Sequence, residues 1–367
     1  MKILATGDWH IGLSQYSRKT DSAIDSRLAD TVAVLDEIVE IAVQQSVDCF
    51  ICSGDIFHTN HPTPRQQEIF LDLLLKLESQ RIRSAFIIGN HDFNAKPSSG
   101  HALLPFKKIA DRMLKFVSIY DKTTEEVFTA NDGSSLRLIY YPYRGDEPDF
   151  SRCGEDGIKT ALVCHSHLEG AVVGAEPFEI AGDSATKFKH LPVDYIFAGH
   201  FHKPQILSEK PLAFYPGSIQ CVDFNERYDE KGVNIIDTEL DQLSCMTRHP
   251  LNSRKFKLIE LVNRVELNAG DLSGIKDSVV KIIVRIHEND LSKFSEEKIL
   301  KTIKQLGAHT ITGISYEIVR PKAVRNSTVR LSNSVIDNFS TYTSLYDSGD
   351  LRTDVDVKGR EIISKCE

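Results

Sequence analysis

The chain has 367 residues, of which 41% are hydrophobic and 26% are charged, values that are ordinary for a globular protein. This length allows one large domain and a smaller one. No run approaches the roughly 18 apolar residues that a bilayer-crossing helix needs, and the short apolar start meets Asp8 at once. The composition argues against a membrane protein, and without a signal-like segment we expect a cytoplasmic protein.

The formal net charge of −8 is unusual for a protein that binds nucleic acid, but the charge is unevenly distributed. Residues 254–330 contain 15 Lys or Arg and 9 Asp or Glu, a balance of +6, so the remainder of the chain carries −14. Two bound divalent ions would add about four positive charges to an acidic site. The net charge therefore does not exclude an anionic substrate.

Seven cysteines are present, and two of them form a C-x-x-C at Cys49 and Cys52 within an apolar run. Side chains alternate between the two faces of a strand, so these thiols would point to opposite faces. No second C-x-x-C completes a zinc site. We therefore expect both cysteines to pack in the core, and free cysteines are typical of the cytoplasm.

The first 250 residues alternate expected strands with expected helices. The expected strands are Lys2–Thr6, Cys49–Cys52, Ser84–Ile88, Arg137–Tyr141, Thr160–Cys164 and Tyr195–Ala198. Apolar residues repeat at helical spacing from Leu28 to Ala42 and from Ile69 to Leu77. This alternation predicts an α/β sandwich around a central sheet, with functional loops just beyond the strand ends.

The pattern changes after Asn252 into a smaller α+β unit, which coincides with the basic stretch. We expect strands at 255–262, 279–286 and 314–319, a helix at 295–306, and a linker at 321–330. The tail carries apolar residues at helical spacing between Leu331 and Leu345, and a second amphipathic piece at 354–363. Such a tail either docks on a partner or packs onto its own chain. We divide the chain into domains 1–252 and 253–322 and a tail 323–367.

Five short segments rich in His, Asp and Asn each follow an expected strand. They are Gly7-Asp8-Trp9-His10, Gly54-Asp55-Ile56-Phe57-His58, Gly89-Asn90-His91-Asp92, Cys164-His165-Ser166-His167 and Gly199-His200-Phe201-His202. One such segment alone is commonly a hydrogen-bonded turn. Five at successive strand ends would converge along one sheet edge, and their mixed nitrogen and oxygen donors suit manganese, iron or zinc better than magnesium.

The order D-x-H, G-D, G-N-H-D, H and G-H-x-H resembles the calcineurin-like metallophosphoesterase pattern. The longer strings G-D-W-H-I-G at 7–12 and G-D-I-F-H-x-x-x-P at 54–62 resemble its SbcD-type branch, the DNA double-strand-break nucleases. The basic unit and the tail also resemble that branch's DNA-capping domain and its segment for binding a partner ATPase. The resemblance implies a four-layer α/β/β/α sandwich with a small α+β capping domain and a helical C-terminal tail.

The resemblance also implies two divalent ions, with Mn²⁺ as our first choice. One ion would be held by Asp8, His10 and His202, and the other by Asn90, His165 and His200. Asp55 would bridge them, since two cations about 4 Å apart need a shared anion between them.

His91 would then be the catalytic histidine that binds no metal, and Asp92 would orient His91 or its loop. In the fourth segment we prefer His165 to His167 as the ligand, because His165 directly follows its strand. His167 would line the cleft. His58 is either a support for His91 or an ordinary loop histidine.

The function implied is a metal-dependent DNA nuclease, an exonuclease on duplex ends and an endonuclease on single strands and hairpins. Its implied partners are DNA and an SMC-like ATPase of the SbcC type, within a heterotetramer built on a homodimer. Two alternatives remain: a phosphodiesterase of this fold with another substrate class, and an inactive scaffold for the ATPase. The basic stretch at 254–330 favours the nuclease, and the complete ligand set argues against the scaffold.

Overall fold

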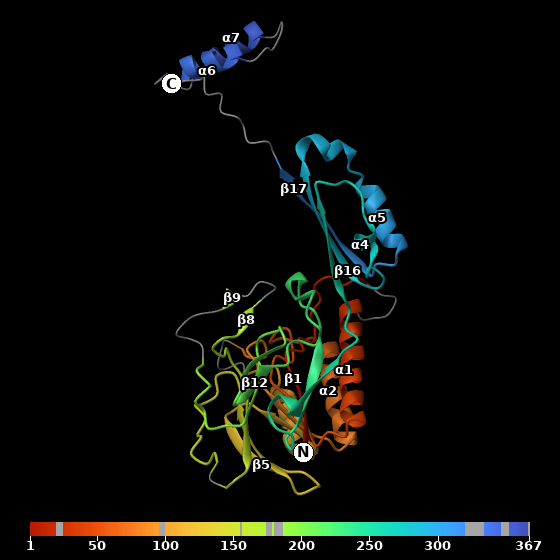
Figure 1. Ribbon diagram of the computed structural model, residues 1–367, viewed down its shortest axis with the longest axis vertical. Coiled ribbons are helices and arrows are strands. Elements are labelled where there is room, and N and C mark those ends of the chain that lie inside the picture. The colour runs from red at the N-terminus through yellow and green to blue at the C-terminus, as the bar shows by residue number, and fades with distance from the viewer. Residues whose placement is uncertain are drawn as a thin grey trace.

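The computed structural model describes residues 1–19, 25–94, 100–154, 156–173, 178–179, 186–319, 334–345 and 352–365 (Figure 1). The expected linker at 321–330 lies outside the described residues, and so does Leu331. The domain boundaries at 252 and 322 remain predictions. No helix in these ranges is long and apolar enough to cross a membrane.

The first of two six-stranded sheets contains three of the expected strands. Its order is β14 (Met246–Pro250), β13 (Gly232–Asp237), β1 (Lys2–Thr6), β2 (Cys49–Cys52), β3 (Arg83–Ile87) and β4 (Val117–Tyr120). β1 is antiparallel to β13, but β1, β2, β3 and β4 are parallel to one another. The carboxyl ends of β1, β2 and β3 therefore lie at one edge.

The second sheet contains the other three expected strands of the large unit. Its order is β11 (Gln205–Glu209), β12 (Leu212–Tyr215), β10 (Tyr195–Gly199), β7 (Lys159–His165), β6 (Ser135–Tyr141) and β5 (Thr124–Thr129). β6, β7, β10 and β12 are parallel, and the register places His165 beside Gly199. A two-stranded pair, β8 (Val172–Val173) and β9 (Phe178–Glu179), lies apart from both sheets.

Three helices pack on the outer face of the first sheet, namely α1 (Ser26–Gln44), α2 (Pro64–Ser79) and α3 (Leu104–Met113). α1 begins where the Asp25 side chain accepts a hydrogen bond from the Leu28 backbone N–H. α2 begins with a reciprocal cap between Thr63 and Gln66, and with Pro64 in its first turn. These caps satisfy N–H groups that have no partner within the helix.

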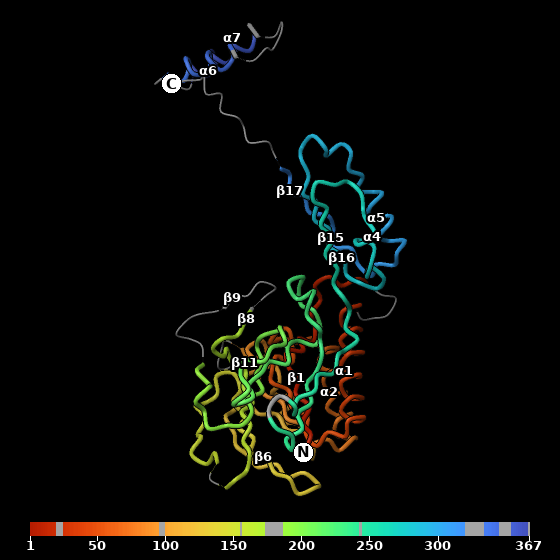
Figure 2. The backbone as a smooth tube through the Cα atoms, in the orientation of Figure 1, coloured from red at the N-terminus to blue at the C-terminus, as the bar shows by residue number. Residues whose placement is uncertain are grey.

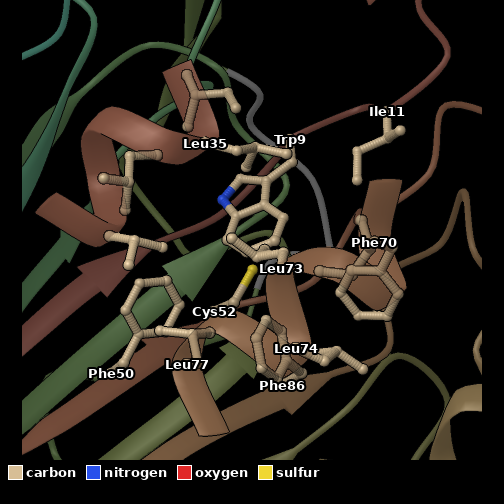
Figure 3. Close-up of a cluster of buried hydrophobic side chains, with 14 of the residues drawn as sticks. Trp9, Ile11, Leu35, Phe50, Cys52, Phe70, Leu73, Leu74, Leu77 and Phe86 are labelled. Carbon is tan, nitrogen blue, oxygen red and sulfur yellow. The ribbon is translucent and has the colours of Figure 1, made fainter. Parts of the chain in front are cut away.

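The hydrophobic core lies in separate layers on both sides of the first sheet. Under the helices, Trp9 contacts the rings of Phe50 and Phe86 edge to face (Figure 3). Cys52 belongs to this layer, whereas Cys49 belongs to the layer between the two sheets. The opposite orientation and structural role predicted for the two cysteines are confirmed.

The α/β sandwich with two central sheets is also confirmed. Among the described residues, the outer face of the second sheet is covered by loop residues such as Leu168, Phe188 and Phe201 rather than by an α-helix. The fourth layer is therefore irregular over this part of the chain.

A third, parallel sheet forms the smaller α+β unit (Figure 2). Its strands are β15 (Phe256–Val262), β16 (Val279–His287) and β17 (Thr310–Val319), and its helices are α4 (Ala269–Leu272) and α5 (Glu296–Gln305). The Arg254 guanidinium binds Asp30 of α1 at 2.5 and 2.6 Å. The ring of Phe256 packs against Phe224 and Tyr16. These contacts hold the unit, called the cap below, against the large sandwich.

The tail forms two helices, α6 (Val335–Leu345) and α7 (Arg352–Ser364), that pack on each other. A Cβ added at Gly359 would lie 2.0 Å from the Phe339 ring, so the ring fills the place that a side chain would take. Thr343 also donates to Asp356 across the pair at 3.0 Å. The helical character predicted for both segments is confirmed.

Several elements were not expected from the sequence: α3, α4, β4, β5, β8, β9 and β11 to β14, and the short 3-10 helices η2 (Phe224–Glu226), η3 (Gln242–Cys245) and η4 (Glu288–Lys293). β5 reads T-E-E-V-F-T and is half-buried at the edge of its sheet. Edge strands carry polar residues on both faces, so neither an apolar run nor a clean alternation marks them.

The buried aromatic layer predicts a large effect of Phe86→Ala on stability. Phe86 is fully buried and contacts the rings of Trp9, Phe50 and Phe70. The cavity should lower the free energy of unfolding by about 3–5 kcal/mol in urea denaturation. Met113→Ala is the control, because Met113 is 75% exposed. Equal stability of the two variants would contradict this packing.

Candidate metal centre

The predicted site residues meet where the parallel strands of both sheets end. Asp8 and His10 follow β1, Asp55 follows β2, and Asn90 and His91 follow β3. From the second sheet, His165 is the last residue of β7, and His200 and His202 follow β10. β1, β2 and β3 are parallel to one another, and so are β7 and β10. The residues that follow these strands therefore lie close together in space.

One group of side chains comprises Asp8, His10 and His202, with a ligand atom of each within 4.8 Å of the others. The Nε2 atoms of His10 and His202 lie 2.9 Å apart. At most one of these two nitrogens can carry a hydrogen, so at least one of them presents a lone pair to the space between the rings. Asp8 and His10 are buried, and His202 is half-buried.

A second group comprises Asn90, His165 and His200. The Asn90 Oδ1 lies 2.9 Å from His165 Nε2 and 3.0 Å from His200 Nδ1. Asp55 lies between the groups: its Oδ1 is 3.4 Å from His165 Nε2, and its Oδ2 is 3.8 Å from His10 Nε2. One carboxylate thus directs an oxygen to each group.

Four of these seven residues have a left-handed backbone conformation that L-residues rarely adopt. Their φ angles are 51° at Asp8, 48° at His10, 53° at Asp55 and 111° at His200. Each such residue costs on the order of 1–3 kcal/mol, and strain of this kind concentrates at functional sites. The strain favours a functional cluster over ordinary loops.

Close packing behind the site requires glycine at position 199. A Cβ added to Gly199 would lie 2.1 Å from the Ser53 carbonyl oxygen and 2.8 Å from His165 Nδ1. The same His165 Nδ1 lies 2.8 Å from the Ser53 oxygen, so it donates a hydrogen bond from the second sheet to the first. Gly199 leaves the room in which this bond forms.

The buried carboxylates and imidazoles strongly perturb one another. Burial raises the pKa of Asp8 to about 6. Burial also acts to raise the pKa of Asp55, but the charge and hydrogen bond of His165 outweigh it and hold that pKa well below its usual range. Burial and the neighbouring His165 lower the pKa of His200 to about 4.

This donor set fits divalent cations. The two groups offer carboxylate, amide and imidazole atoms that face one another, and most of these atoms are hydrogen-bond acceptors. The buried Nδ1 of His10 has no hydrogen-bond partner among the described residues. Positive charge between the groups would favour ionised carboxylates and neutral imidazoles together. Mixed nitrogen and oxygen ligation of this kind is typical of manganese, iron and zinc.

His91 lies beside these two groups, and a ligand atom of its ring also lies within 4.8 Å of ligand atoms of His10 and His58. Its Nδ1 donates to the His58 carbonyl oxygen at 2.8 Å, and its backbone N–H donates to Asp55 at 2.9 Å. The His91 ring stands edge to face against His10, 4.7 Å between centroids, and the His58 ring stacks on it at 5.7 Å. Nε2 is therefore the ring atom of His91 that remains to exchange a proton.

Asp92 supports the loops and not the His91 side chain. Its carboxylate accepts hydrogen bonds from the backbone N–H groups of Ile56 at 3.2 Å, Phe57 at 2.9 Å and Gly89 at 3.0 Å. The loops after β2 and β3 are thereby tied together. Of the two roles expected for Asp92, the structure favours the loop.

His167 lies outside both groups, where its ring packs edge to face against Phe201 at 5.2 Å. The preference for His165 over His167 agrees with this placement, and the ligand assignment stays a prediction.

Two residues behind the site, Glu226 and Lys231, were not predicted from the sequence. His202 Nδ1 lies 2.8 Å from the Glu226 carboxylate, and Lys231 Nζ lies 2.6 Å from the other oxygen of that carboxylate. Burial acts to raise the pKa of Glu226, but His202 and Lys231 lower it to about 2. Neither residue belongs to one of the five ligand-rich segments, so the sequence carried no signal of this contact.

Residues 1–204 match the family model of calcineurin-like phosphoesterases, and the chain belongs to this family. The SbcD subunit of the SbcCD nuclease of Bacillus subtilis is 27% identical over 268 residues, covering 65% of this chain and 66% of that protein. The corresponding protein of Escherichia coli K12 is 26% identical, covering 64% of each chain. The DNA double-strand break repair protein Mre11 of Thermoplasma acidophilum is 28% identical, covering 85% of this chain and 87% of its own length.

These comparisons agree with the resemblance found in the motifs. The matched regions span just under two thirds of the two bacterial SbcD proteins, and more of the archaeal protein. The metallophosphoesterase fold class is confirmed, and the relatives carry the names of nucleases and DNA repair proteins.

The packing at Gly199 predicts a loss of metal affinity in Gly199→Ala. The added methyl group would displace Ser53 or His165, so Mn²⁺ affinity in isothermal titration calorimetry should fall about 10- to 100-fold. Gly270→Ala is the control, because its Cβ meets only the side-chain oxygen of Asn268 at 3.3 Å. Wild-type Mn²⁺ binding by Gly199→Ala would contradict the proposed position of His165.

Proposed function

We propose that this protein is a two-metal DNA nuclease that acts as the nuclease subunit of a DNA-end-processing complex. The observation that carries this proposal is the pair of donor groups joined through Asp55. Relatives named as SbcCD nuclease and as Mre11 supply the substrate class. The reaction would be hydrolysis of a phosphodiester.

In this proposal, Asp8, His10 and His202 hold one ion and Asn90, His165 and His200 hold the other. Asp55 contributes an oxygen to each. Bound divalent ions, Mn²⁺ by preference, would neutralise the phosphodiester and lower the pKa of a water molecule that attacks it. The neutral Asn90 amide keeps the occupied site positive, so an anionic substrate still binds.

The protein's own part is to position these ligands and to move a proton. The bond from His91 Nδ1 to the His58 carbonyl fixes the orientation of the ring. Nε2 can then stabilise charge on the phosphate or protonate the leaving oxygen, the role of a general acid. The backbone bond from His91 to Asp55 holds this ring beside the ions.

The names of the relatives also suggest the kinds of DNA that the protein cleaves and the partner that it binds. We propose exonuclease action on duplex ends and endonuclease action on single strands and hairpins, with the basic stretch at 254–330 binding DNA. The helices α6 and α7 leave apolar residues exposed, among them Val335, Tyr342 and Ile362. We assign this surface to an SMC-like ATPase of the SbcC type, and the complex to a heterotetramer with a homodimer of this chain.

Substrate and metal can be tested together. Purified protein, alone and with its partner ATPase, should cleave linear duplex and hairpin DNA in Mn²⁺, because the ions supply charge that no side chain at this site replaces. Chelation should abolish cleavage and added Mn²⁺ should restore it. Hydrolysis of bis(p-nitrophenyl) phosphate without any DNA cleavage would point instead to a phosphodiesterase of another substrate class.

Replacement of His91 separates its role from that of the ligands. His91→Ala should still bind two Mn²⁺ ions, but its rate of DNA cleavage should fall about 10²- to 10⁴-fold, the usual contribution of a general acid. His61→Ala is the matched control, an exposed histidine on the loop after β2 that contributes to neither donor group. Normal DNA cleavage by His91→Ala would contradict the proposed role of His91 as the proton donor.

A further inference from the structure

Resting on the two-metal function proposed above, we propose that Glu226 is a positioning residue for one of the two ions. It fixes the His202 ring so that the group of Asp8, His10 and His202 can hold its cation. Glu226 itself lies outside that group and would touch neither metal nor substrate.

The geometry fixes the tautomer of His202. Glu226 Oε1 lies 2.8 Å from Nδ1, and a carboxylate oxygen can only accept, so Nδ1 carries the hydrogen. In the neutral ring Nε2 then keeps its lone pair, and Nε2 is the atom 2.9 Å from His10 Nε2. A carboxylate behind a ligating imidazole also increases the basicity of the ligand nitrogen.

Glu226 is itself held by a second set of contacts. Its Oε2 accepts from Lys231 Nζ at 2.6 Å, Ser218 Oγ at 3.1 Å and the Val222 backbone N–H at 3.1 Å. Lys231 is 1% exposed, so this is a buried ion pair rather than a surface contact. A buried carboxylate with four partners cannot swing away from the ring it holds.

Lys231 also reaches the backbone of the ligand. Its Nζ donates to the His202 carbonyl oxygen at 3.2 Å and to Ser218 Oγ at 2.9 Å. The main chain of His202 is therefore fixed by Lys231, and its ring is fixed by Glu226. This arrangement suits a ligand that comes from a loop beyond the strand end.

The other ligand histidines lack such a partner, which makes the two ion sites unequal. His165 Nδ1 donates to a neutral backbone carbonyl, and His10 Nδ1 has no partner among the described residues. Only His202 of the described ligands is backed by an ionised carboxylate. We therefore infer that loss of Glu226 weakens one ion and spares the other.

The experiment compares Mn²⁺ binding by wild type, Glu226→Gln and Glu126→Gln in the full-length protein. Glu126 is the matched control: it is also a glutamate in an ion pair, 2.7 Å from Arg83, and it lines a separate surface of the sandwich on β5. Calorimetric titration gives the number and affinity of the ions. Electron paramagnetic resonance distinguishes coupled Mn²⁺ pairs from single ions.

We expect wild type and Glu126→Gln to bind two ions as a coupled pair. Glu226→Gln should bind one ion normally and the other about 10- to 100-fold more weakly, with a single-ion signal at limiting Mn²⁺. Its DNA cleavage should recover when Mn²⁺ is raised by the same factor, whereas His91→Ala should not recover. Two ions at wild-type affinity in Glu226→Gln would overturn the inference; fewer than two in wild type would overturn the two-metal function instead.

Glu226→Gln removes the nearer of two carboxylates beside the buried Lys231 and leaves only Asp229, at 3.6 Å. A second variant therefore removes both charges of the Glu226–Lys231 pair. The double variant Glu226→Gln, Lys231→Met should fold and show the same selective loss of one ion.

A measurement on the wild-type chain is independent of either variant. In ¹⁵N-histidine spectra without metal, recorded at a pH at which the ring is neutral and with signals assigned through His202→Gln, His202 should carry its hydrogen on Nδ1; a neutral ring with its hydrogen on Nε2 would contradict the inference.

Discussion

The hydrogen bond from His165 Nδ1 to the Ser53 carbonyl oxygen is the contact on which the site depends. It joins the end of β7 in one sheet to the end of β2 in the other, and it turns Nε2 of His165 toward Asp55 and Asn90. If the two sheets did not approach each other closely, neither sheet alone would supply all the metal-binding side chains. The glycine at position 199 leaves the space that this approach needs.

The proposed chemistry depends on the Asp55 carboxylate, which directs one oxygen to each group of ligands. Asp55 faces both groups, and its backbone partner His91 lies next to them with its ring against that of His10. Asp92 ties the two loops that carry Asp55 and His91 through three backbone hydrogen bonds. The proposed bridging carboxylate and the proposed proton donor are therefore on loops held by one buried group, Asp92.

The cap is connected to the same region through a few side chains. Phe256 at the start of β15 packs on Phe224, and Phe224 begins the short helix that ends in Glu226. Arg254 and Asp30 add an ion pair beside this aromatic contact. The cap is thus seated next to the segment that carries the carboxylate behind His202.

The sequence by itself determined the six main strands, the helical stretches and the five ligand-rich segments, because strand alternation, helical spacing and turn residues are local properties. The preference for His165 over His167 as a ligand, which stays a prediction, used only the position of His165 at a strand end. The motif resemblance already implied that Asp55 lies between the two groups of ligands. Tertiary structure alone decided which atoms face each other across the sheets, and that Glu226 and Lys231 lie behind His202. These contacts join residues 24 or more positions apart through burial, and burial is a property of the packed chain that no local pattern records.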